Sequence, residues 1–216
     1  MENMTANFRK MLKDHKVEDI DIILDVGTRD AKQSIEFFAH YPKAKIYSFE
    51  ANSDTYKRAL ANTQHTNNIE VFNLAIADYD GEIPFYKVKP PKEGVSSVTG
   101  IPMDLNYEEL KVPCMRLDTW AKNVGVSKID IIWADLQGAE LKMLLGLGDL
   151  LKTVKAFQVE VIYFHNHFKG CNSYRDIVDF CEDNSFKCVS NIHHEGNPYG
   201  GDAVFVRSAY LENYRY

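Results

Sequence analysis

The chain has 216 residues, and its 25 lysines and arginines against 31 aspartates and glutamates give a formal net charge of −6. A hydrophobic content of 45% and a charged content of 26% are ordinary for a globular protein and exclude disordered and collagen-like classes. The apolar runs are too short to cross a membrane. The acidic balance, without basic residues clustered among aromatics, also makes nucleic acid an unexpected partner.

One domain over residues 1–216 is expected from this length. Within it, the spacing of Met4, Phe8, Met11 and Leu12 predicts an N-terminal helix in residues 1–18 that packs on the core. The first residues are charged and lack the apolar segment of a signal peptide, so we expect a cytoplasmic protein. The cysteines match no CxxC spacing and are expected to be reduced thiols.

Short apolar runs alternate with amphipathic stretches from residue 21 to about residue 161, which is typical of βαβ units on a parallel sheet. The strands predicted in the first half cover residues 20–26, 46–49 and 69–74. Apolar residues at helical spacing predict helices over residues 31–39 and from the N-cap candidate Ser53 to Leu60.

The second half begins with a turn at Asp80 and Gly81, after which residues 82–88 are expected to pair back as an additional strand. Residues 89–100 are rich in Pro, Gly and Ser and predict a loop of the kind that carries binding residues. Further strands are expected over residues 129–133 and 154–161, followed by an antiparallel hairpin of residues 186–192 and 203–206. Helices are expected over residues 119–124, around Leu141, Leu144 and Leu145, and over residues 174–184.

Carboxylates follow several of the predicted strands. Asp25 and Gly27 end the first strand, Glu50 follows the second, and Asp135 follows the strand at residues 129–133. Because the carboxyl ends of parallel strands meet at one edge of a sheet, we expect these groups to lie in one crevice. Glu50 lies 23 residues after Gly27, a spacing suited to accepting hydrogen bonds from the hydroxyls of a ribose.

The absence of a dinucleotide-binding motif, together with the acidic residues, indicates which nucleoside the crevice binds. A dinucleotide pyrophosphate needs a G-x-G-x-x-G loop, and counting from Gly27 the next two glycine positions are Arg29 and Lys32. Asp25 would repel a pyrophosphate and would favour a cationic amino group. S-adenosylmethionine has a ribose, an adenine and an ammonium but no phosphate, so its charge pattern fits better than that of NAD.

Seven stretches of the chain, in this order and spacing, resemble the FkbM-type class I S-adenosylmethionine-dependent methyltransferases. They are LDVGTRDAKQS (24–34), IYSFEANSDTYKRALAN (46–62), NLAIADYDGEIPF (73–85), SSV (96–98), RLDTW (116–120), IDIIWADLQGAELKMLLG (129–146) and FQVEV (157–161). The resemblance implies an α/β fold with a Rossmann-like seven-stranded methyltransferase sheet, mostly parallel with an antiparallel last strand and with helices on both faces. It also implies methyl transfer, usually to a hydroxyl of a sugar or other small molecule.

The same resemblance assigns cofactor contacts. Asp25 and Gly27 would hold the methionine part of S-adenosylmethionine, and Glu50 would hold its ribose. The residues beside the ribose would be Ala51 and Asn52. Arg29, in the loop after the first strand, would either pair with the carboxylate of the cofactor or be solvated.

The adenine and the acceptor are assigned in the same way. Ala75, Ile76 and Ala77 would border the adenine, with Asp78 near its amino group, and Asp135 would face the sulfonium and the incoming acceptor. Two positions depart from the family pattern. Ala31 stands where the family loop commonly has glycine, and Gln137 stands where the D-x-E-G-x-E segment has its first glutamate, so a role that needed an acid there is in doubt.

Methyl transfer to a hydroxyl requires a base that removes the hydroxyl proton, and Asp135 is the first candidate. In a second interpretation a divalent cation at Asp135 lowers the pKa of the hydroxyl, with Glu160 or His165 completing its ligands. Ser96, Ser97 and His165 are candidates for contact with the acceptor.

Two other functions stay open at this point. The chain could be a non-catalytic, methyltransferase-like module that binds a nucleoside, which the glutamine at position 137 makes more credible. An NAD-dependent oxidoreductase is disfavoured by Arg29 and Lys32. The sequence is compatible with a homo-oligomer and does not name the acceptor.

Overall fold

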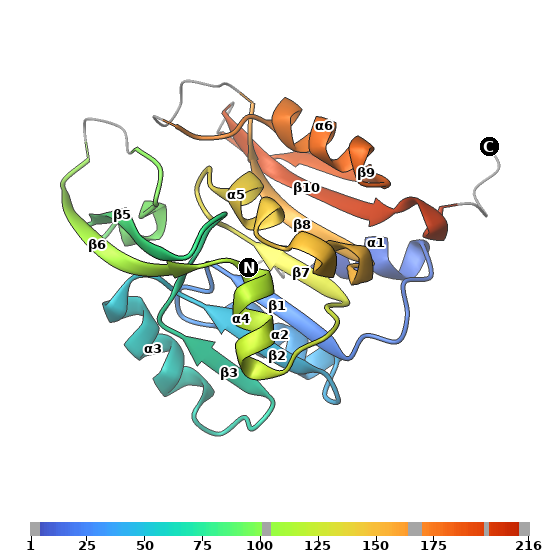
Figure 1. Ribbon diagram of the computed structural model, residues 1–216, viewed down its shortest axis with the longest axis horizontal. Coiled ribbons are helices and arrows are strands. Elements are labelled where there is room, and N and C mark those ends of the chain that lie inside the picture. Colours follow the sequence, from blue (N-terminus) through green and yellow to red (C-terminus); the bar gives the residue numbers. More distant parts are fainter. Residues whose placement is uncertain (1–4, 101–104, 164–169, 197–198, 212–216) are drawn as a thin grey trace.

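The computed structural model describes residues 5–100, 105–163, 170–196 and 199–211 of the chain (Figure 1). Seven strands form one sheet in the order β3-β2-β1-β7-β8-β10-β9. Neighbouring strands from β3 to β8 are parallel, whereas β10 is antiparallel to both β8 and β9. The strands are β1 (Ile22–Val26), β2 (Lys45–Phe49), β3 (Ile69–Phe72), β7 (Ile131–Ala134), β8 (Ala156–Ile162), β9 (Phe186–His193) and β10 (Gly200–Arg207). The expected sheet, with its antiparallel last strand and terminal hairpin, is confirmed.

β1 lies at the centre of this sheet, between β2 and β7. Its residues Ile23, Leu24 and Val26 are fully buried, because helices cover both faces of the parallel strands and leave no wet face. The chain builds β2 and β3 on one side of β1 and β7 and β8 on the other. The strand order therefore switches at β1, and ligands of open α/β sheets bind at the carboxyl ends of the strands at such a switch.

One face of the sheet is covered by α1 (Ala6–Asp14) and α2 (Lys32–His40). Phe8 of α1 and Phe37 of α2 meet Trp133 of β7 in a buried group of rings, with centroids 6.0 to 6.2 Å apart. Buried aromatic rings remove a large apolar area from water and fix how each helix lies on the sheet. The predicted N-terminal helix is therefore present, and it packs on the sheet.

The opposite face is covered by α4 (Leu117–Val124), α5 (Glu140–Leu145) and α6 (Tyr174–Asp183). Trp120 of α4 packs edge to face on Phe49 and Phe72, with ring centroids 4.9 and 5.6 Å away. α6 begins with a capping box, in which the Ser173 hydroxyl and the Asp176 carboxylate satisfy each other's backbone N–H. Helices thus lie on both faces, as expected.

α3 (Ser53–Thr63) follows β2 and contacts β3 at the edge of the sheet. Its N-cap is Asn52, whose side-chain oxygen accepts a hydrogen bond from the Asp54 N–H at 3.0 Å, so the cap lies one residue before the predicted Ser53. No helix in the described parts of the chain combines the length and apolar character of a membrane span.

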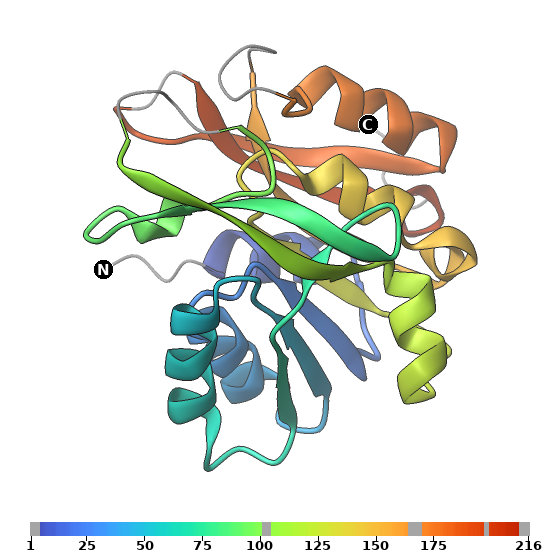
Figure 2. The ribbon, with the colours of Figure 1, turned by 60° about the vertical axis from the view of Figure 1, so that its left-hand side comes forward.

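A second, three-stranded sheet stands beside the main one, in the order β4-β6-β5 (Figure 2). It consists of β4 (Ala75–Ile76), β5 (Gly81–Val88) and β6 (Tyr107–Met115). The additional strand predicted at residues 82–88 exists, but its antiparallel partner is β6, which the sequence did not predict. The first half of β6 is exposed and polar, and the inward alternation of Leu110, Val112 and Cys114 is short and interrupted by Pro113, so the strand gave a weak signal.

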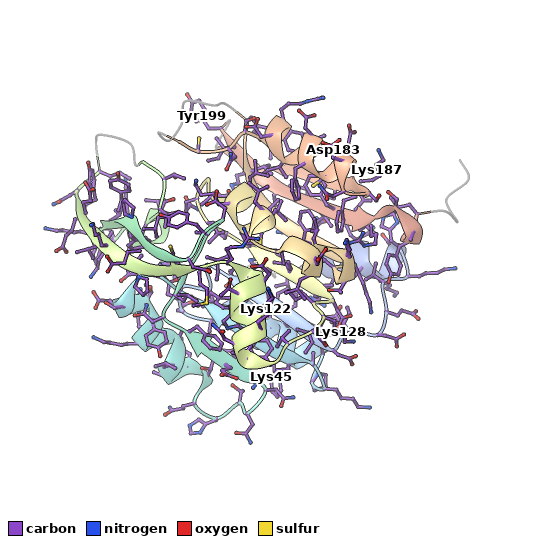
Figure 3. The ribbon with its side chains drawn as sticks, in the orientation of Figure 1. Lys45, Lys122, Lys128, Asp183, Lys187 and Tyr199 are labelled. Carbon is purple, nitrogen blue, oxygen red and sulfur yellow. The ribbon has the colours of Figure 1, made fainter. Side chains whose placement is uncertain are left out.

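The amino-terminal edge of the main sheet carries a buried carboxylate. Asp130 accepts two backbone N–H groups at the start of β1, each at 2.9 Å, and pairs with Lys155 at 3.0 Å. The pKa of Asp130 lies below its ordinary value, because burial raises it by less than the two N–H groups and Lys155 lower it. Figure 3 labels Lys45 and Lys128 at this edge, where Lys128 also pairs with Asp130. At the amino-terminal ends of the strands, Asp130 is thus paired with two lysines and two backbone N–H groups. At the carboxyl-terminal ends, carboxylates lie next to one another, as described below.

Candidate functional site

A pocket opens at the carboxyl ends of β1, β2 and β7 and is partly covered by the segment after β5. Its empty space is about 1000 Å³, a figure that includes open solvent at its mouth. We call it the main pocket. The predicted site residues that line it are Gly27, Arg29, Glu50, Ala51, Ser96, Ser97 and Asp135.

Gly27 lets the loop after β1 approach the loop after β7. It has φ +85°, and a Cβ built on it would lie 2.0 Å from the backbone oxygen of Asp135. A side chain at this position would therefore collide with backbone, and the left-handed conformation would add strain. The N–H groups of Gly27 and Thr28 both donate to the Phe49 carbonyl, which ties this turn to the end of β2.

Asp25 lies beneath the main pocket and does not line it. Its Oδ2 accepts hydrogen bonds from the hydroxyls of Thr28 and Ser34, and its Oδ1 is buried without a hydrogen-bond partner among the described residues. Burial raises the pKa of Asp25 to about 6, against the lowering effect of both hydroxyls. Asp25 Oδ2 thus ties the loop after β1 to α2, and the direct contact with a methionine ammonium stays a prediction.

Glu50 joins the turns that follow β1 and β2. Its Oε2 accepts the Arg29 N–H at 2.8 Å and its Oε1 accepts the Asn52 N–H at 2.7 Å. Burial raises the pKa of Glu50 to about 7, although both N–H groups lower it. Asn52, predicted beside the ribose, does not line the pocket, since its side chain caps α3. Ala51 does line it.

Of the four residues predicted around the adenine, the first two line the main pocket and the last two do not. Ala75 and Ile76 of β4 line it, whereas Ala77 and Asp78 do not. The Ala77 N–H donates to Met115 of β6, and the Asp78 carboxylate lies 4.0 Å from Lys142, outside the pocket. Pairing of β4 with β6 turns the chain away from the pocket after Ile76. Phe85 of β5 and Val98 add further apolar surface.

The segment after β5 is fastened over the pocket by an ion pair. Glu93 lies 3.6 Å from the Arg29 guanidinium and 3.3 Å from that of Arg58 on α3. Its side chain is only 12% exposed, whereas both arginines are about half exposed. Arg29 therefore uses its side chain on this segment and its backbone N–H on Glu50.

Two predicted acceptor contacts, Ser96 and Ser97, use their hydroxyls within the protein. The Ser96 hydroxyl donates to the Glu93 carbonyl at 2.7 Å and accepts the Val88 N–H at 3.0 Å. The Ser97 hydroxyl is within hydrogen-bond distance of the Gln137 carbonyl, at 3.0 Å, and of the Thr99 hydroxyl, at 2.9 Å. These contacts fix the segment after β5 to the loop after β7, and acceptor binding by the serines stays a prediction.

Asp135, the predicted base, follows β7 and lines the main pocket. The Gln137 amide nitrogen donates to Asp135 Oδ1 at 2.7 Å and to Glu160 Oε2 at 2.5 Å. Burial raises the pKa of Asp135, against the lowering hydrogen bond from Gln137, and burial together with Asp135 raises that of Glu160 well above its ordinary value. Two carboxylates with raised pKa thus lie side by side.

His194 and Asp202 extend this polar group away from Asp135. His194 Nε2 lies 3.0 Å from Asp202 Oδ2, and its Nδ1 lies 3.9 Å from Glu160 Oε1. Glu160 and Asp202 face each other in the register of β8 and β10, so the sheet itself brings them together.

A metal centre finds no support in the parts of the chain that the structure describes, where no three histidine, cysteine or carboxylate side chains are placed to hold an ion. His165, named as a possible metal ligand and acceptor contact, lies outside the described residues. Asp135 and Glu160 are close, but the donor between them is the amide of Gln137.

Several residues that build the site escaped sequence reasoning. Glu93, Thr99 and Asp202 were not singled out, because their contacts join segments far apart in the sequence. Gln137 was noticed only as a departure from the family pattern. Gln137 donates to two carboxylates because β8 brings Glu160 next to it. The spacing of residues 135–140 does not predict where β8 lies.

Two solved structures illustrate proteins with a similar fold. Fibrillarin, a pre-rRNA processing protein of Methanococcus jannaschii, gives a TM-score of 0.56 at 12% identity over 89% of this chain and 68% of that one. Fibrillarin of Aeropyrum pernix, solved with natively bound S-adenosylmethionine, gives 0.55 at 11% identity over 88% of this chain and 68% of that one. At these identities the likeness concerns the fold, which is Rossmann-like.

Curated relatives include two enzymes named for methyl transfer. The chain is 27% identical over 154 residues to 2-O-methyltransferase NoeI of Sinorhizobium fredii, covering 64% of this chain and 62% of that protein. It is 22% identical over 147 residues to hexuronic acid methyltransferase AglP of Haloferax volcanii, covering 68% of this chain and 58% of that protein. The matched region thus spans about three fifths of each relative.

The family match covers the site itself. The profile of the methyltransferase FkbM domain matches residues 25–188, which run from the end of β1 into β9. This range is more than half of the chain and includes Gly27, Glu50, Asp135 and Glu160. The chain therefore belongs to the FkbM-domain methyltransferase family.

Proposed function

We propose that this methyltransferase uses S-adenosylmethionine to methylate a hydroxyl of a sugar or related small molecule. The observation that carries the proposal is the placement of two carboxylates in one pocket. Glu50 lies at the end of β2 and Asp135 at the end of β7, with the Gly27 turn between them. One is suited to a ribose and the other to a reacting hydroxyl.

The main pocket fits the nucleoside chemically. Each Glu50 oxygen accepts one backbone N–H and retains a lone pair for a ribose hydroxyl. Ala75, Ile76 and Phe85 offer an apolar surface for a purine. Gly27 lets the turn after β1 pack against the backbone of Asp135, and the amino acid part of the cofactor would lie beside this turn. Bound there, S-adenosylmethionine supplies a methyl group made electrophilic by its sulfonium.

Asp135 is the proposed general base. A carboxylate with a raised pKa removes a hydroxyl proton more effectively than an ordinary one, because its pKa lies closer to the working pH. Burial produces this shift, and Gln137 and Glu160 hold the group in place. The positioning of the hydroxyl against Asp135 supplies the remaining advantage, by converting an encounter in solution into a fixed geometry.

A sugar acceptor is supported by the names of the relatives. NoeI is a 2-O-methyltransferase and AglP a hexuronic acid methyltransferase. Both are distant, and about two fifths of each lies outside the matched region, so the acceptor class comes to this chain as part of the proposal.

A non-catalytic module that binds the nucleoside is the second candidate. The observation that favours it is Gln137, an amide at a position where the family pattern has an acid. The two candidates differ in one outcome, since such a module binds S-adenosylhomocysteine but transfers no methyl group.

The test is methyl transfer from S-adenosylmethionine with a tritiated methyl group. The acceptors are methyl glycosides of neutral hexoses and deoxyhexoses, together with hexuronic acids. The wild type is expected to label at least one of them, and labelling of none would contradict a sugar acceptor.

With the labelled acceptor, Asp135→Asn is expected to lower kcat by about 100-fold or more, because the amide cannot accept the proton. Its affinity for S-adenosylhomocysteine, measured by calorimetry, should stay within about twofold of wild type, since Glu50 and the apolar wall are unchanged. The matched control is Asp149→Asn, which should behave as wild type because its side chain is 93% exposed and does not line the main pocket. Wild-type turnover by Asp135→Asn would remove Asp135 as the base.

A further inference from the structure

The loop after β7 holds Gln137 in an unusual backbone conformation. Gln137 has φ +52° and is followed by Gly138 at φ +98°, so two consecutive residues adopt the left-handed region. Few residues with a side chain adopt this conformation, and it persists where the surroundings fix the backbone.

The surroundings fix this loop from two sides. The hydroxyls of Ser97 and Thr99 donate to the Gln137 carbonyl at 3.0 and 2.9 Å. On the other side, Glu140 Oε1 accepts the backbone N–H groups of Leu136 and Gly138 at 2.9 and 3.3 Å. These hydrogen bonds hold the backbone of the loop, and the Gln137 side chain lies towards Asp135 and Glu160.

The Gln137 amide nitrogen then donates to both carboxylates, at 2.7 Å to Asp135 and 2.5 Å to Glu160. An NH₂ group has two donors, so one amide can serve two acceptors at once. A carboxylate at position 137 would offer no donor and would bring a third acid to the same place. The amide therefore suits a pair of neighbouring carboxylates better than an acid would.

Resting on the proposed function, we propose that Gln137 is a positioning residue of the reaction: its amide holds the Asp135 carboxylate against Glu160 and so aims it at the acceptor hydroxyl. It does not touch the acceptor or the cofactor, and Gln137 is not among the residues that line the main pocket. Its effect reaches the reaction through the orientation of Asp135. The glutamine that replaces the family's glutamate at position 137 then has a function in this site.

Three variants test whether Gln137 orients the Asp135 carboxylate or only stabilises the loop after β7. Gln137→Met keeps the length and volume of the side chain but has no donor. Gln137→Glu places three acids together. The double variant Gln137→Glu with Glu160→Gln restores one amide among two carboxylates, with the amide now on β8, where residue 160 is within hydrogen-bonding reach of Asp135.

The kinetic readout uses the acceptor labelled by the wild type. Both single variants are expected to lose kcat by at least about tenfold, with KM for the acceptor, the Kd for S-adenosylhomocysteine and the melting temperature close to wild type. The double variant should recover most of the loss of Gln137→Glu. Unchanged kcat in Gln137→Met, or no recovery in the double variant, would overturn the positioning role.

Crystal structures of the wild type and of Gln137→Met, grown with S-adenosylhomocysteine, provide a readout that needs no acceptor. The amide is expected to bridge Asp135 and Glu160 in the wild type, and the Asp135 carboxylate to turn away from its wild-type position in Gln137→Met. An Asp135 that keeps its orientation in the variant contradicts the proposal. Absence of methyl transfer by the wild type would instead contradict the proposed function, so the two failures are distinguishable.

Discussion

Glu50 shows how burial of one residue can make ligand binding depend on pH. Its carboxylate accepts two backbone N–H groups, but burial outweighs them and raises its pKa from 4.5 to about 7. The folded protein therefore holds a proton that the unfolded chain releases at lower pH. As the pH rises from 4.5 through 7, ionisation of Glu50 costs stability, while the ionised group gains the capacity to accept ribose hydroxyls.

The affinity for S-adenosylhomocysteine is accordingly expected to increase with pH. If the ionised Glu50 binds the ribose, the Kd should fall by about tenfold between pH 6 and pH 8, because one proton is released on binding below pH 7. Calorimetry at pH 6 and at pH 8 measures this Kd. Glu50→Gln is the control, with weaker binding and a flat profile over this range. A wild-type Kd that does not change with pH would contradict the role of Glu50.

At the scale of residues, the sequence predicts positions better than contacts. Gly27, Glu50 and Asp135 were predicted to share a crevice because each follows a parallel strand, and the structure places them in one pocket. Strand position alone could not show whether Asp25 contacts a ligand directly. Whether a carboxylate faces a pocket or neighbouring hydroxyls depends on α2, which brings Ser34 against Asp25.

At the scale of elements, residues 89–99, which follow β5, form one wall of the main pocket. Glu93 anchors this segment to Arg29 on the turn after β1 and to Arg58 on α3. Ser97 and Thr99 anchor its other end to the loop after β7. The segment therefore touches three separate parts of the pocket wall, and loosening it should affect how long a ligand stays.

Glu93→Gln tests this anchor. The neutral amide cannot pair with the two guanidinium groups, so we expect the dissociation rate of S-adenosylhomocysteine to increase by roughly threefold to tenfold, with a small effect on the association rate. Stopped-flow fluorescence or surface plasmon resonance measures both rates. Glu82→Gln, on the exposed start of β5, is the matched control and should dissociate as the wild type does. Equal dissociation rates for both variants would show that the anchor does not retain the ligand.

Elements of the main sheet were predictable because helices cover both of its faces, which leaves long apolar runs in its strands. The small sheet was not, since the first half of β6 is exposed and polar and β4 has only two residues. The error had a consequence for the site. Without the pairing of β4 with β6, Ala77 and Asp78 were predicted beside the adenine, although that pairing turns them away from the pocket.

At the scale of the molecule, the two edges of the main sheet differ in how their charges are paired. The amino-terminal edge holds Asp130 among lysines and backbone N–H groups, which keeps it ionised. The carboxyl-terminal edge holds Asp135, Glu160 and Asp202 with an amide and a histidine between them. Among the aspartates and glutamates of the described residues, those with a raised pKa are Asp25, Glu50, Asp135, Glu140 and Glu160. They lie towards the carboxyl ends of the strands, where ligands of such sheets bind and where perturbed carboxylates mark function.

The overall architecture was predicted from alternation of strands and helices together with the family resemblance. Alternation indicates a parallel sheet, but it does not order the strands. The reversed β10 came from the resemblance alone, because a hairpin of any sheet would give the same local pattern, and the position of β9 at the edge was not predicted.

The central claim is that the main pocket binds a phosphate-free, positively charged nucleoside. Its most direct test is calorimetric titration of the wild-type protein with S-adenosylhomocysteine and, separately, with NADH at pH 8. We predict saturable binding of one equivalent of S-adenosylhomocysteine, weakened at least about tenfold in Glu50→Gln, and no binding of NADH. Saturable binding of NADH, with no heat from S-adenosylhomocysteine, would contradict the account.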